Sequence, residues 1–213
     1  AGKIQDAKAL HRFLSQVTVV SFENEFVDCD ALERAAQGTA ARFVPTLDVL
    51  RELQDKLRQK KLLERLKLPA PPFLELPATL SAQEAVRKAQ GRFPKGFVLK
   101  WSRLGYDGKG VFISKNPSNE GPVAEEFCRV SFARGVPVYA EEKVAFRREL
   151  AIIACQSSNP GEFATYPLVL SEQQNGVCHR VLGPARLLGV SAELEKQASE
   201  FARTLARALA MPG

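Results

Sequence analysis

The sequence predicts a mixed fold, α/β in its first part and α+β in its second. Three observations support this prediction. Helical and extended segments alternate at the start of the chain, a proline-rich connector interrupts it near residue 70, and short extended segments dominate after residue 93. With 213 residues, of which 45% are hydrophobic, the chain is long enough for one large or two small hydrophobic cores.

The first part of the chain alternates between two periodicities. Residues 6–16 have the amphipathic spacing of a helix and lead into an extended run at residues 17–22. A short helix at 28–36 and an extended segment at 43–45 complete the pattern expected at the end of a doubly wound sheet. In residues 46–66, leucines at helical spacing with a polar break at 54–56 predict two consecutive helices.

Prolines mark the change to the second part. Pro69, Pro71 and Pro72 end the preceding helix and predict an extended connector as far as Pro77. Ser81 begins a capping box, and further helices are predicted at 81–90, at 123–132 and from Ser191 to about 209. Short strands are predicted at residues 97–101, 111–114, 136–142, 149–155, 163–170 and 177–182. The turn between residues 155 and 163 predicts an antiparallel hairpin.

Composition excludes several classes of protein. No apolar run reaches the roughly 18 to 20 residues of a membrane helix, and the first residues lack a signal-peptide pattern, so we expect a cytoplasmic protein. A single tryptophan and scattered basic residues give no nucleic-acid-binding pattern, although the net charge is +6. Three of the four cysteines lie among apolar neighbours, which favours reduced, buried thiols over disulfides or a zinc site.

A lysine followed by a glycine-rich loop is the most informative motif. Lys100 ends a predicted strand, and glycines occupy three of the six positions of the loop GYDGKG at 105–110. Such a loop exposes backbone N–H groups that can surround a polyphosphate. An ordinary hairpin is the alternative, because Asp107-Gly108 is a favoured turn pair.

A second motif contains several acids. Residues 138–144 (VYAEEKV) end a predicted strand with two glutamates, and Glu149 precedes the next apolar strand. The turn could line a nucleotide pocket, with its backbone at the adenine edge and a carboxylate at the ribose. A solvated hairpin end with mixed charges is the alternative.

Together these segments resemble the ATP-grasp superfamily, and within it the 5-(carboxyamino)imidazole ribonucleotide synthases of purine biosynthesis. The resemblance covers nearly the whole chain, in matching order and spacing. It is carried by FENEFVD at 22–28, QDKLRQKKLLERLKLPAPPF at 54–73, FVLKWSRLGYDGKGVF at 97–112, YAEEKVAFRRELAII at 139–153 and YPLVLSEQQNGV at 166–177.

The resemblance implies a set of site residues. Lys100 would contact ATP, Lys56 replaces an arginine of the family and keeps its positive charge, and Glu149 would bind the ribose. The implied ATP-binding set is Lys56, Lys100, Gly105, Tyr106, Asp107, Gly108, Lys109, Gly110, Val111, Glu141, Glu142, Lys143, Val144, Glu149 and Gln173. Glu23, Tyr106 and Lys109 would face the aminoimidazole ribonucleotide, with a strand-end turn as the equal alternative for Glu23.

The sequence also departs from the family. Gln173 stands where the family has a histidine, and Leu170-Ser171 replaces a Glu-Asn pair. The family's glycine-rich first strand and its two metal-binding glutamates have no counterparts here, so ATP and magnesium are the implied cofactors without metal ligands in this sequence. His11 and His179 are expected to be structural or solvent-facing.

The resemblance implies a domain organisation and a function. It divides the chain into a partial N-terminal α/β domain (1–48), a helical linker (49–93), an ATP-grasp lid (94–150) and part of the C-terminal ATP-grasp core (151–213). The implied activity is ATP-dependent carboxylation of aminoimidazole ribonucleotide with bicarbonate, in a protein that can form a homodimer. We expect this chain alone to be inactive. The alternative is a non-catalytic nucleotide-binding remnant or an interaction module.

Overall fold

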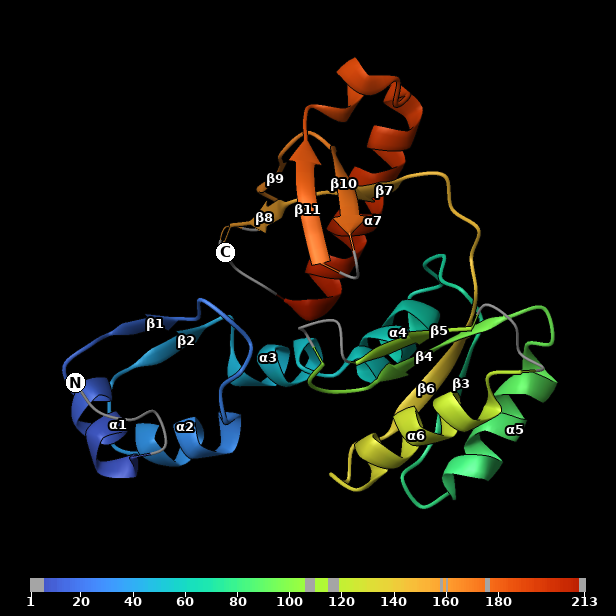
Figure 1. Cartoon of the computed structure of the whole chain (residues 1–213). Helices are drawn as coiled ribbons and strands as arrows, with labels where there is room; N and C mark the ends of the chain where they lie inside the picture. The colour runs from blue at the N-terminus through green and yellow to red at the C-terminus, as the bar shows by residue number, and fades with distance from the viewer. Residues whose placement is uncertain are drawn as a thin grey trace. The chain divides into compact units, whose positions relative to one another are not determined.

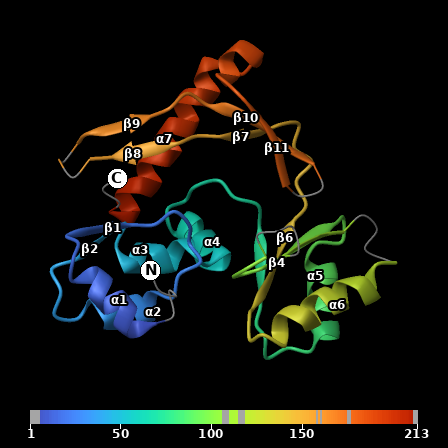
Figure 2. The same cartoon turned by 60° about the vertical axis from the view of Figure 1, so that its left-hand side comes forward.

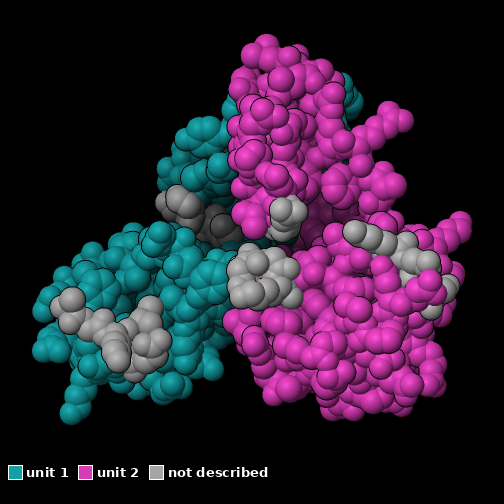
Figure 3. Space-filling view, in the orientation of Figure 1, with its two compact units in different colours: residues 1–54, 152–167, 191–213 teal, residues 55–151, 168–190 magenta. Residues whose placement is uncertain are grey.

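The computed structural model describes residues 6–105, 110–114, 119–157, 159, 161–174 and 177–210 (Figure 1). The chain divides into two compact units (Figure 3). Unit 1 comprises residues 1–54, 152–167 and 191–213, and unit 2 comprises residues 55–151 and 168–190.

The first part of unit 1 is a small α/β arrangement. It contains α1 (Ala7–Leu14), β1 (Val19–Ser21), α2 (Cys29–Ala36), β2 (Arg42–Val44) and α3 (Leu47–Leu53). Asp6, Asp28 and Thr46 cap the three helices, and each side chain accepts hydrogen bonds from backbone N–H groups of the first turn. The two strands pair in parallel, and the buried residues Cys29, Leu32, Leu47 and Leu50 form a small core. These elements confirm the predicted alternation.

The rest of unit 1 is a hairpin and a long helix. β8 (Ala154–Gln156) and β9 (Phe163–Thr165) are antiparallel, which confirms the predicted hairpin. Helix α7 (Ala192–Leu209) begins at the predicted N-cap Ser191 and packs against β8 (Figure 2).

Unit 2 is built on a four-stranded antiparallel sheet. The sheet has the order β3-β6-β4-β5, formed by β3 (Phe73–Leu76), β6 (Val138–Glu142), β4 (Phe97–Trp101) and β5 (Val111–Ile113). Three helices accompany it: α4 (Lys56–Arg65), α5 (Ala82–Arg92) and α6 (Gly121–Phe132). Ser81 and Glu84 form the predicted capping box of α5.

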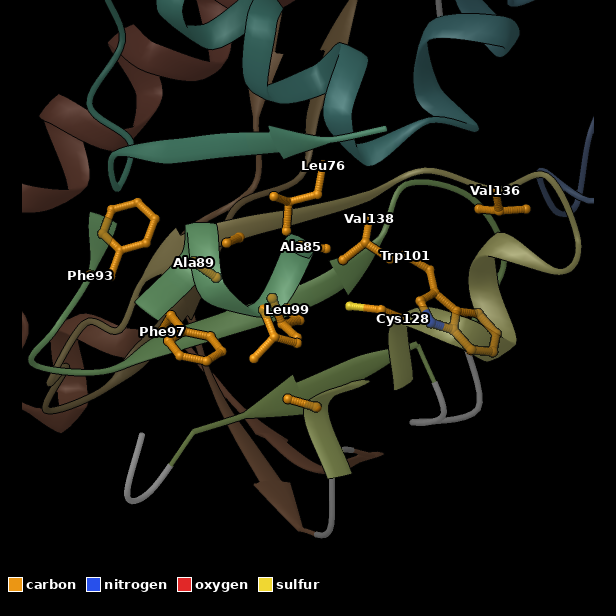
Figure 4. Packing of buried hydrophobic residues seen from close by; sticks show 13 residues of the cluster. Leu76, Ala85, Ala89, Phe93, Phe97, Leu99, Trp101, Cys128, Val136 and Val138 are labelled. Carbon is orange, nitrogen blue, oxygen red and sulfur yellow. The ribbon is translucent and has the colours of Figure 1, made fainter. Parts of the chain in front are cut away.

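One face of this sheet carries the main hydrophobic core. Because side chains alternate along a strand, Phe97, Leu99 and Trp101 lie on the same face of β4. They pack with residues of the neighbouring strands and with α5 and α6 (Figure 4). The core contains Leu76, Ala85, Val86, Ala89, Phe93, Phe97, Leu99, Trp101, Ala124, Cys128, Val136, Val138 and Ala140. Residues at the alternate positions, including Lys100 and Glu141, therefore belong to the opposite face.

A second sheet of unit 2 has three strands in the order β11-β10-β7. It is formed by β7 (Glu149–Ala151), β10 (Val169–Gln174) and β11 (Val177–Leu182), all antiparallel to their neighbours. No strand residue described in this sheet is fully buried. The 3-10 helix η1 (Ala185–Leu188) follows it.

The structure corrects three predictions. Residues 73–76, predicted as part of an extended connector, form strand β3, because their backbone pairs with β6. The predicted strands 149–155 and 163–170 are each split between two sheets, as β7 and β8, and as β9 and β10. Pro167 lies at the second break and has no N–H to continue a ladder.

The cysteine prediction was half right. All four thiols are free, and Cys29 and Cys128 are buried, but Cys155 and Cys178 are exposed because they lie on the open faces of short strands. Burial raises the pKa of Cys128 to about 12, so this thiol is unreactive near neutral pH. Within the described parts of the chain, no helix is both long and apolar enough to span a membrane.

Candidate functional site

The polar face of the four-stranded sheet brings Lys100 and Glu141 together. In the antiparallel register, Lys100 of β4 lies opposite Tyr139 of β6, and Glu141 lies opposite Val98. Lys100 and Glu141 are therefore diagonal neighbours on one face of the sheet. The Lys100 ammonium forms a direct ion pair with Glu141 Oε1.

A second lysine reaches the same carboxylate from helix α4. Nζ of Lys60 lies 2.6 Å from Glu141 Oε2. The Glu141 side chain is only 8% exposed, against 13% for Lys60 and 28% for Lys100. Burial favours the protonated form of Glu141, but the two ammonium groups outweigh burial and hold its pKa below the ordinary value. The structure thus contains an ionised, nearly buried carboxylate between two cations.

The glycine-rich loop has a narrow neck directly after Lys100. Gly110 N donates to Gly105 O at 3.3 Å, and Trp101 N donates to Gly110 O at 3.0 Å. A Cβ on Gly105 would lie 2.4 Å from the Gly110 Cα, so a side chain at this position would collide with backbone. Gly105 also has a φ of +78°, which favours glycine. The loop residues Tyr106, Asp107, Gly108 and Lys109 lie outside the described residues.

The start of helix α4 contacts the loop near this neck. Lys56 Nζ donates to Leu104 O at 3.0 Å, and Lys56 N donates to Ser102 O at 2.7 Å. The helix cap Asp55 forms an ion pair with Arg103, with 3.4 Å between Oδ2 and Nε. The predicted site residue Lys56 therefore lies beside the predicted phosphate loop.

The other predicted residues of the acidic motif surround the end of β6. Lys143 Nζ donates to Ser114 O at 3.0 Å, and Glu142 N donates to Pro72 O at 2.9 Å. Glu142, Lys143 and Val144 are exposed, whereas Glu141 is buried. Val111, at the start of β5, lies opposite Lys100 and is exposed.

Glu149 and Gln173 line one pocket of about 770 Å³. In the three-stranded sheet, Glu149 lies opposite Ser171, and Gln173 Nε2 donates to Ser171 Oγ at 2.8 Å. The rest of the lining is a mixture of apolar, polar and charged side chains: Phe146, Arg147, Arg148, Leu170, Ser171, Glu172, Leu182 and Leu188. Two residues predicted to contact the nucleotide are thus brought together from segments 24 residues apart in sequence.

Glu23 lines a separate pocket in unit 1. This pocket has a volume of about 400 Å³ and is otherwise mostly apolar, with Asn24 as its neighbouring polar residue. Asn24 Oδ1 accepts a hydrogen bond from Phe26 N at 2.9 Å, which is the geometry of a strand-end turn. Glu23 therefore lines a pocket next to a strand-end turn.

The described residues contain no group of three or more His, Cys, Asp or Glu side chains arranged to hold a metal ion. His11 Nδ1 lies 2.8 Å from Ala35 O in unit 1, and His179 is exposed on β11.

Sequence reasoning missed Lys60. A signal was present, because Lys60 follows Lys56 by four residues and the two share one face of α4. Only the structure shows that this face lies against the polar face of the sheet. Arg147 and Arg148, which line the pocket of Glu149, were also missed.

Comparison with known proteins places this arrangement in a family. The ATP-grasp domain model matches residues 61–213, which is most of the chain. The chain belongs to the ATP-grasp family. The N5-carboxyaminoimidazole ribonucleotide synthase of Synechococcus elongatus is 39% identical over 202 residues, which are 95% of this chain and 47% of that protein. This chain thus spans about half the length of the curated relatives it matches.

Solved structures give the same result for the fold. The carboxyaminoimidazole ribonucleotide synthase of Aspergillus clavatus, complexed with ATP, matches with a TM-score of 0.83 and 29% identity. The match covers 100% of this ATP-grasp chain and 52% of the fungal chain. A complex of the Aspergillus clavatus enzyme with ADP and 5-aminoimidazole ribonucleotide matches with a TM-score of 0.81 and 27% identity. The mixed α/β fold with several sheets is therefore that of these synthases over half their length.

Proposed function

We propose that unit 2 binds ATP, and that the chain acts as part of a carboxyaminoimidazole ribonucleotide synthase. The relatives carrying that name support the proposal, and two of the matched fungal structures hold ATP, or ADP with 5-aminoimidazole ribonucleotide. The reaction would be the ATP-dependent carboxylation of aminoimidazole ribonucleotide with bicarbonate in purine biosynthesis.

The observation that carries the proposal is Lys100 at the neck of the glycine-rich loop. Its strand places the ammonium on the polar face of the sheet, paired with Glu141, while the loop begins five residues later. A cation beside a glycine loop is suited to a polyphosphate, because the loop supplies N–H donors and the lysine supplies charge. In this proposal Gly105, Gly110 and Val111 belong to the loop over the phosphates.

The remaining predicted residues would bind the rest of the nucleotide. Residues 141–144 would form the adenine hinge, where Glu141 keeps its carboxylate in the sheet and the exposed Glu142, Lys143 and Val144 follow it. Glu149 would accept hydrogen bonds from the ribose hydroxyls, and Gln173 in the same pocket would donate or accept one. Lys56, at the loop neck, would supply a second cation.

The chemistry would proceed in two transfers. A bicarbonate oxygen attacks the γ-phosphorus of ATP, which forms carboxyphosphate and releases ADP. The exocyclic amine of aminoimidazole ribonucleotide then attacks the carboxyl carbon and releases phosphate. Glu23, Tyr106 and Lys109 would face the ribonucleotide. Magnesium supplies charge neutralisation in reactions of this class, but the described carboxylates do not form a ligand set for it.

We also propose a division of the chain into parts of the ATP-grasp fold. Residues 1–48 would be the remnant of a doubly wound N-terminal domain, residues 49–93 a helical linker, residues 94–150 the ATP-grasp lid and residues 151–213 part of the ATP-grasp core. The parallel β1–β2 pair and the antiparallel strands of unit 2 support this order.

Calorimetric titration of ATP with magnesium into the chain tests the proposal. We expect saturable binding that Lys100→Ala abolishes. The control is Lys8→Ala, at an exposed position of α1 in unit 1, which should leave the affinity unchanged. Failure to detect ATP binding at millimolar nucleotide would contradict the proposal.

A second candidate is a nucleotide-binding module without catalysis. It is favoured by the lack of a three-ligand metal group among the described residues. Phosphate release is measured in the presence of ATP, bicarbonate and aminoimidazole ribonucleotide. Substrate-dependent release at about 1 per second or faster would establish an enzyme and contradict the module.

A further inference from the structure

The ion cluster on the polar face of the four-stranded sheet contains two lysines but only one glutamate. Glu141 is held by two lysines, Lys100 from β4 and Lys60 from α4, so the three side chains together carry a net charge of +1. The four-stranded sheet and α4 both belong to unit 2. One carboxylate can neutralise only one of the two ammonium groups.

The two lysines differ in their access to solvent. Lys60 is 13% exposed and lies against a carboxylate that is 8% exposed, whereas Lys100 is 28% exposed and stands next to the loop neck. Lys100 therefore offers a ligand arriving from solvent more of its side chain than Lys60 does. Without Lys60, Lys100 and Glu141 would be a neutral pair, and an incoming phosphate would compete with Glu141 for the only ammonium.

We propose that Lys60 is a positioning residue that neutralises Glu141 and thereby leaves the charge of Lys100 available to a phosphate group of the nucleotide. This inference rests on the proposed function, since it assigns the phosphate-binding role to Lys100. Lys60 itself does not touch the nucleotide. It acts through Glu141, by holding one carboxylate oxygen while Lys100 holds the other.

The adjacent residue Lys61 provides a matched control. It forms an ion pair of the same length, 2.6 Å, with Glu75 of β3, but both side chains are well exposed, at 50% and 44%. Water screens such a pair, and it lies outside the cluster of Lys100. Lys60→Met and Lys61→Met therefore each remove one lysine from neighbouring positions of the same helix. Only Lys60→Met is expected to lower the affinity for ATP.

The first test is the affinity for ATP and for adenosine. Lys60→Met should weaken ATP binding on the order of tenfold to a hundredfold, the range of one charge-assisted contact. Its affinity for adenosine, which has no phosphates, should be unchanged. Lys60→Arg, which keeps the charge, and Lys61→Met should both bind ATP as the unaltered chain does. Equal loss of adenosine and ATP affinity would show a general structural role and overturn the inference.

A double variant gives a sharper test. Lys60→Met combined with Glu141→Gln removes one positive and one negative charge, so the cluster regains its net charge of +1 on Lys100. Its ATP affinity should be higher than that of Lys60→Met, because the carboxylate that competes with phosphate for Lys100 is gone. A double variant that binds no better than Lys60→Met would overturn the inference.

A third measurement is independent of nucleotide. In protein with ¹³C-labelled glutamate, the Glu141 carboxyl signal is assigned by its loss in Glu141→Gln, and its pKa is followed by titration. Lys60→Met should raise this pKa, and Lys61→Met should not. An unchanged pKa would overturn the inference even if ATP binds.

Failure of the inference can be told apart from failure of the proposed function. If the unaltered chain does not bind ATP, the proposed function and the inference are both overturned. If the unaltered chain and Lys60→Met bind ATP with equal affinity, only the inference is overturned.

Discussion

The two sheets of unit 2 are stabilised in different ways. The four-stranded sheet buries an apolar face against α5 and α6 and holds a nearly buried ion cluster on its other face. The three-stranded sheet has no fully buried strand residue, and β11 is exposed along most of its length. Predicted site residues occur on both, with Lys100 and Glu141 on the first and Glu149 and Gln173 on the second.

This difference predicts how strongly substitutions in each sheet change stability. A substitution in the four-stranded sheet changes packing or an interior charge, so it should change the free energy of unfolding. A substitution in the three-stranded sheet mainly changes groups that water already solvates. Four substitutions test this comparison, in order of decreasing effect.

Leu99→Ala should have the largest effect. Leu99 is 0% exposed and lies at the centre of the core face of β4, so its truncation leaves a cavity bounded by β4, α5 and α6. We expect a loss of about 3 to 5 kcal/mol in the free energy of unfolding, measured by urea denaturation. Leu187→Ala in η1, where the side chain is 81% exposed, is the control and should change it by less than about 0.5 kcal/mol. Similar losses in the two variants would contradict the comparison.

Glu141→Gln should destabilise the chain by about 3 kcal/mol, since it leaves Lys60 and Lys100 without their counter-charge in a nearly buried position. The effect should depend on pH. Because the folded pKa of Glu141 is lowered, its contribution is complete above the ordinary value of 4.5 and is lost as the pH falls through the folded pKa.

Urea denaturation from pH 7 to pH 3 measures this dependence. The difference between the unaltered chain and Glu141→Gln should be constant near neutral pH and should shrink below pH 4.5. If the difference in the free energy of unfolding instead grew on acidification, it would contradict a stabilising role of ionised Glu141.

Gly110→Ala should cost about 1 to 3 kcal/mol, because the added Cβ would lie 2.6 Å from the Cα of Gly105 and the neck would have to open. Gly91→Ala is the matched control. Gly91 lies within α5 and a Cβ there meets nothing within 4 Å, so alanine should stabilise the helix by up to about 1 kcal/mol. Thermal unfolding of both variants should shift in opposite directions, and a shift of the same sign would argue against a closed neck.

Arg180→Ala should have the smallest effect. Arg180 pairs with Glu172 across β10 and β11 at 2.7 Å, but both side chains are largely solvated. We expect a change of about 0.5 kcal/mol or less in the free energy of unfolding. A loss above about 1.5 kcal/mol would show that the three-stranded sheet depends on this pair and would remove the contrast between the sheets.

Local patterns in the sequence determined most elements of this protein. Asp6, Asp28 and Thr46 begin helices because their side chains accept backbone N–H groups a few residues later, and the Ser81 capping box acts in the same way. The alternation in residues 97–101 likewise fixes which side chains of β4 can enter a core. These interactions span only a few residues, so the sequence displays them directly.

Tertiary structure decided what these patterns leave open. Residues 73–76 are a strand only because β6, more than 60 residues later, supplies their hydrogen-bond partners. Likewise, nothing in the local sequence around Lys60 shows that it meets Glu141, 81 residues away, in the same ion cluster as Lys100. Strand pairing and buried charge pairs join distant segments, so they depend on the packing of the whole unit and not on the order of neighbouring residues.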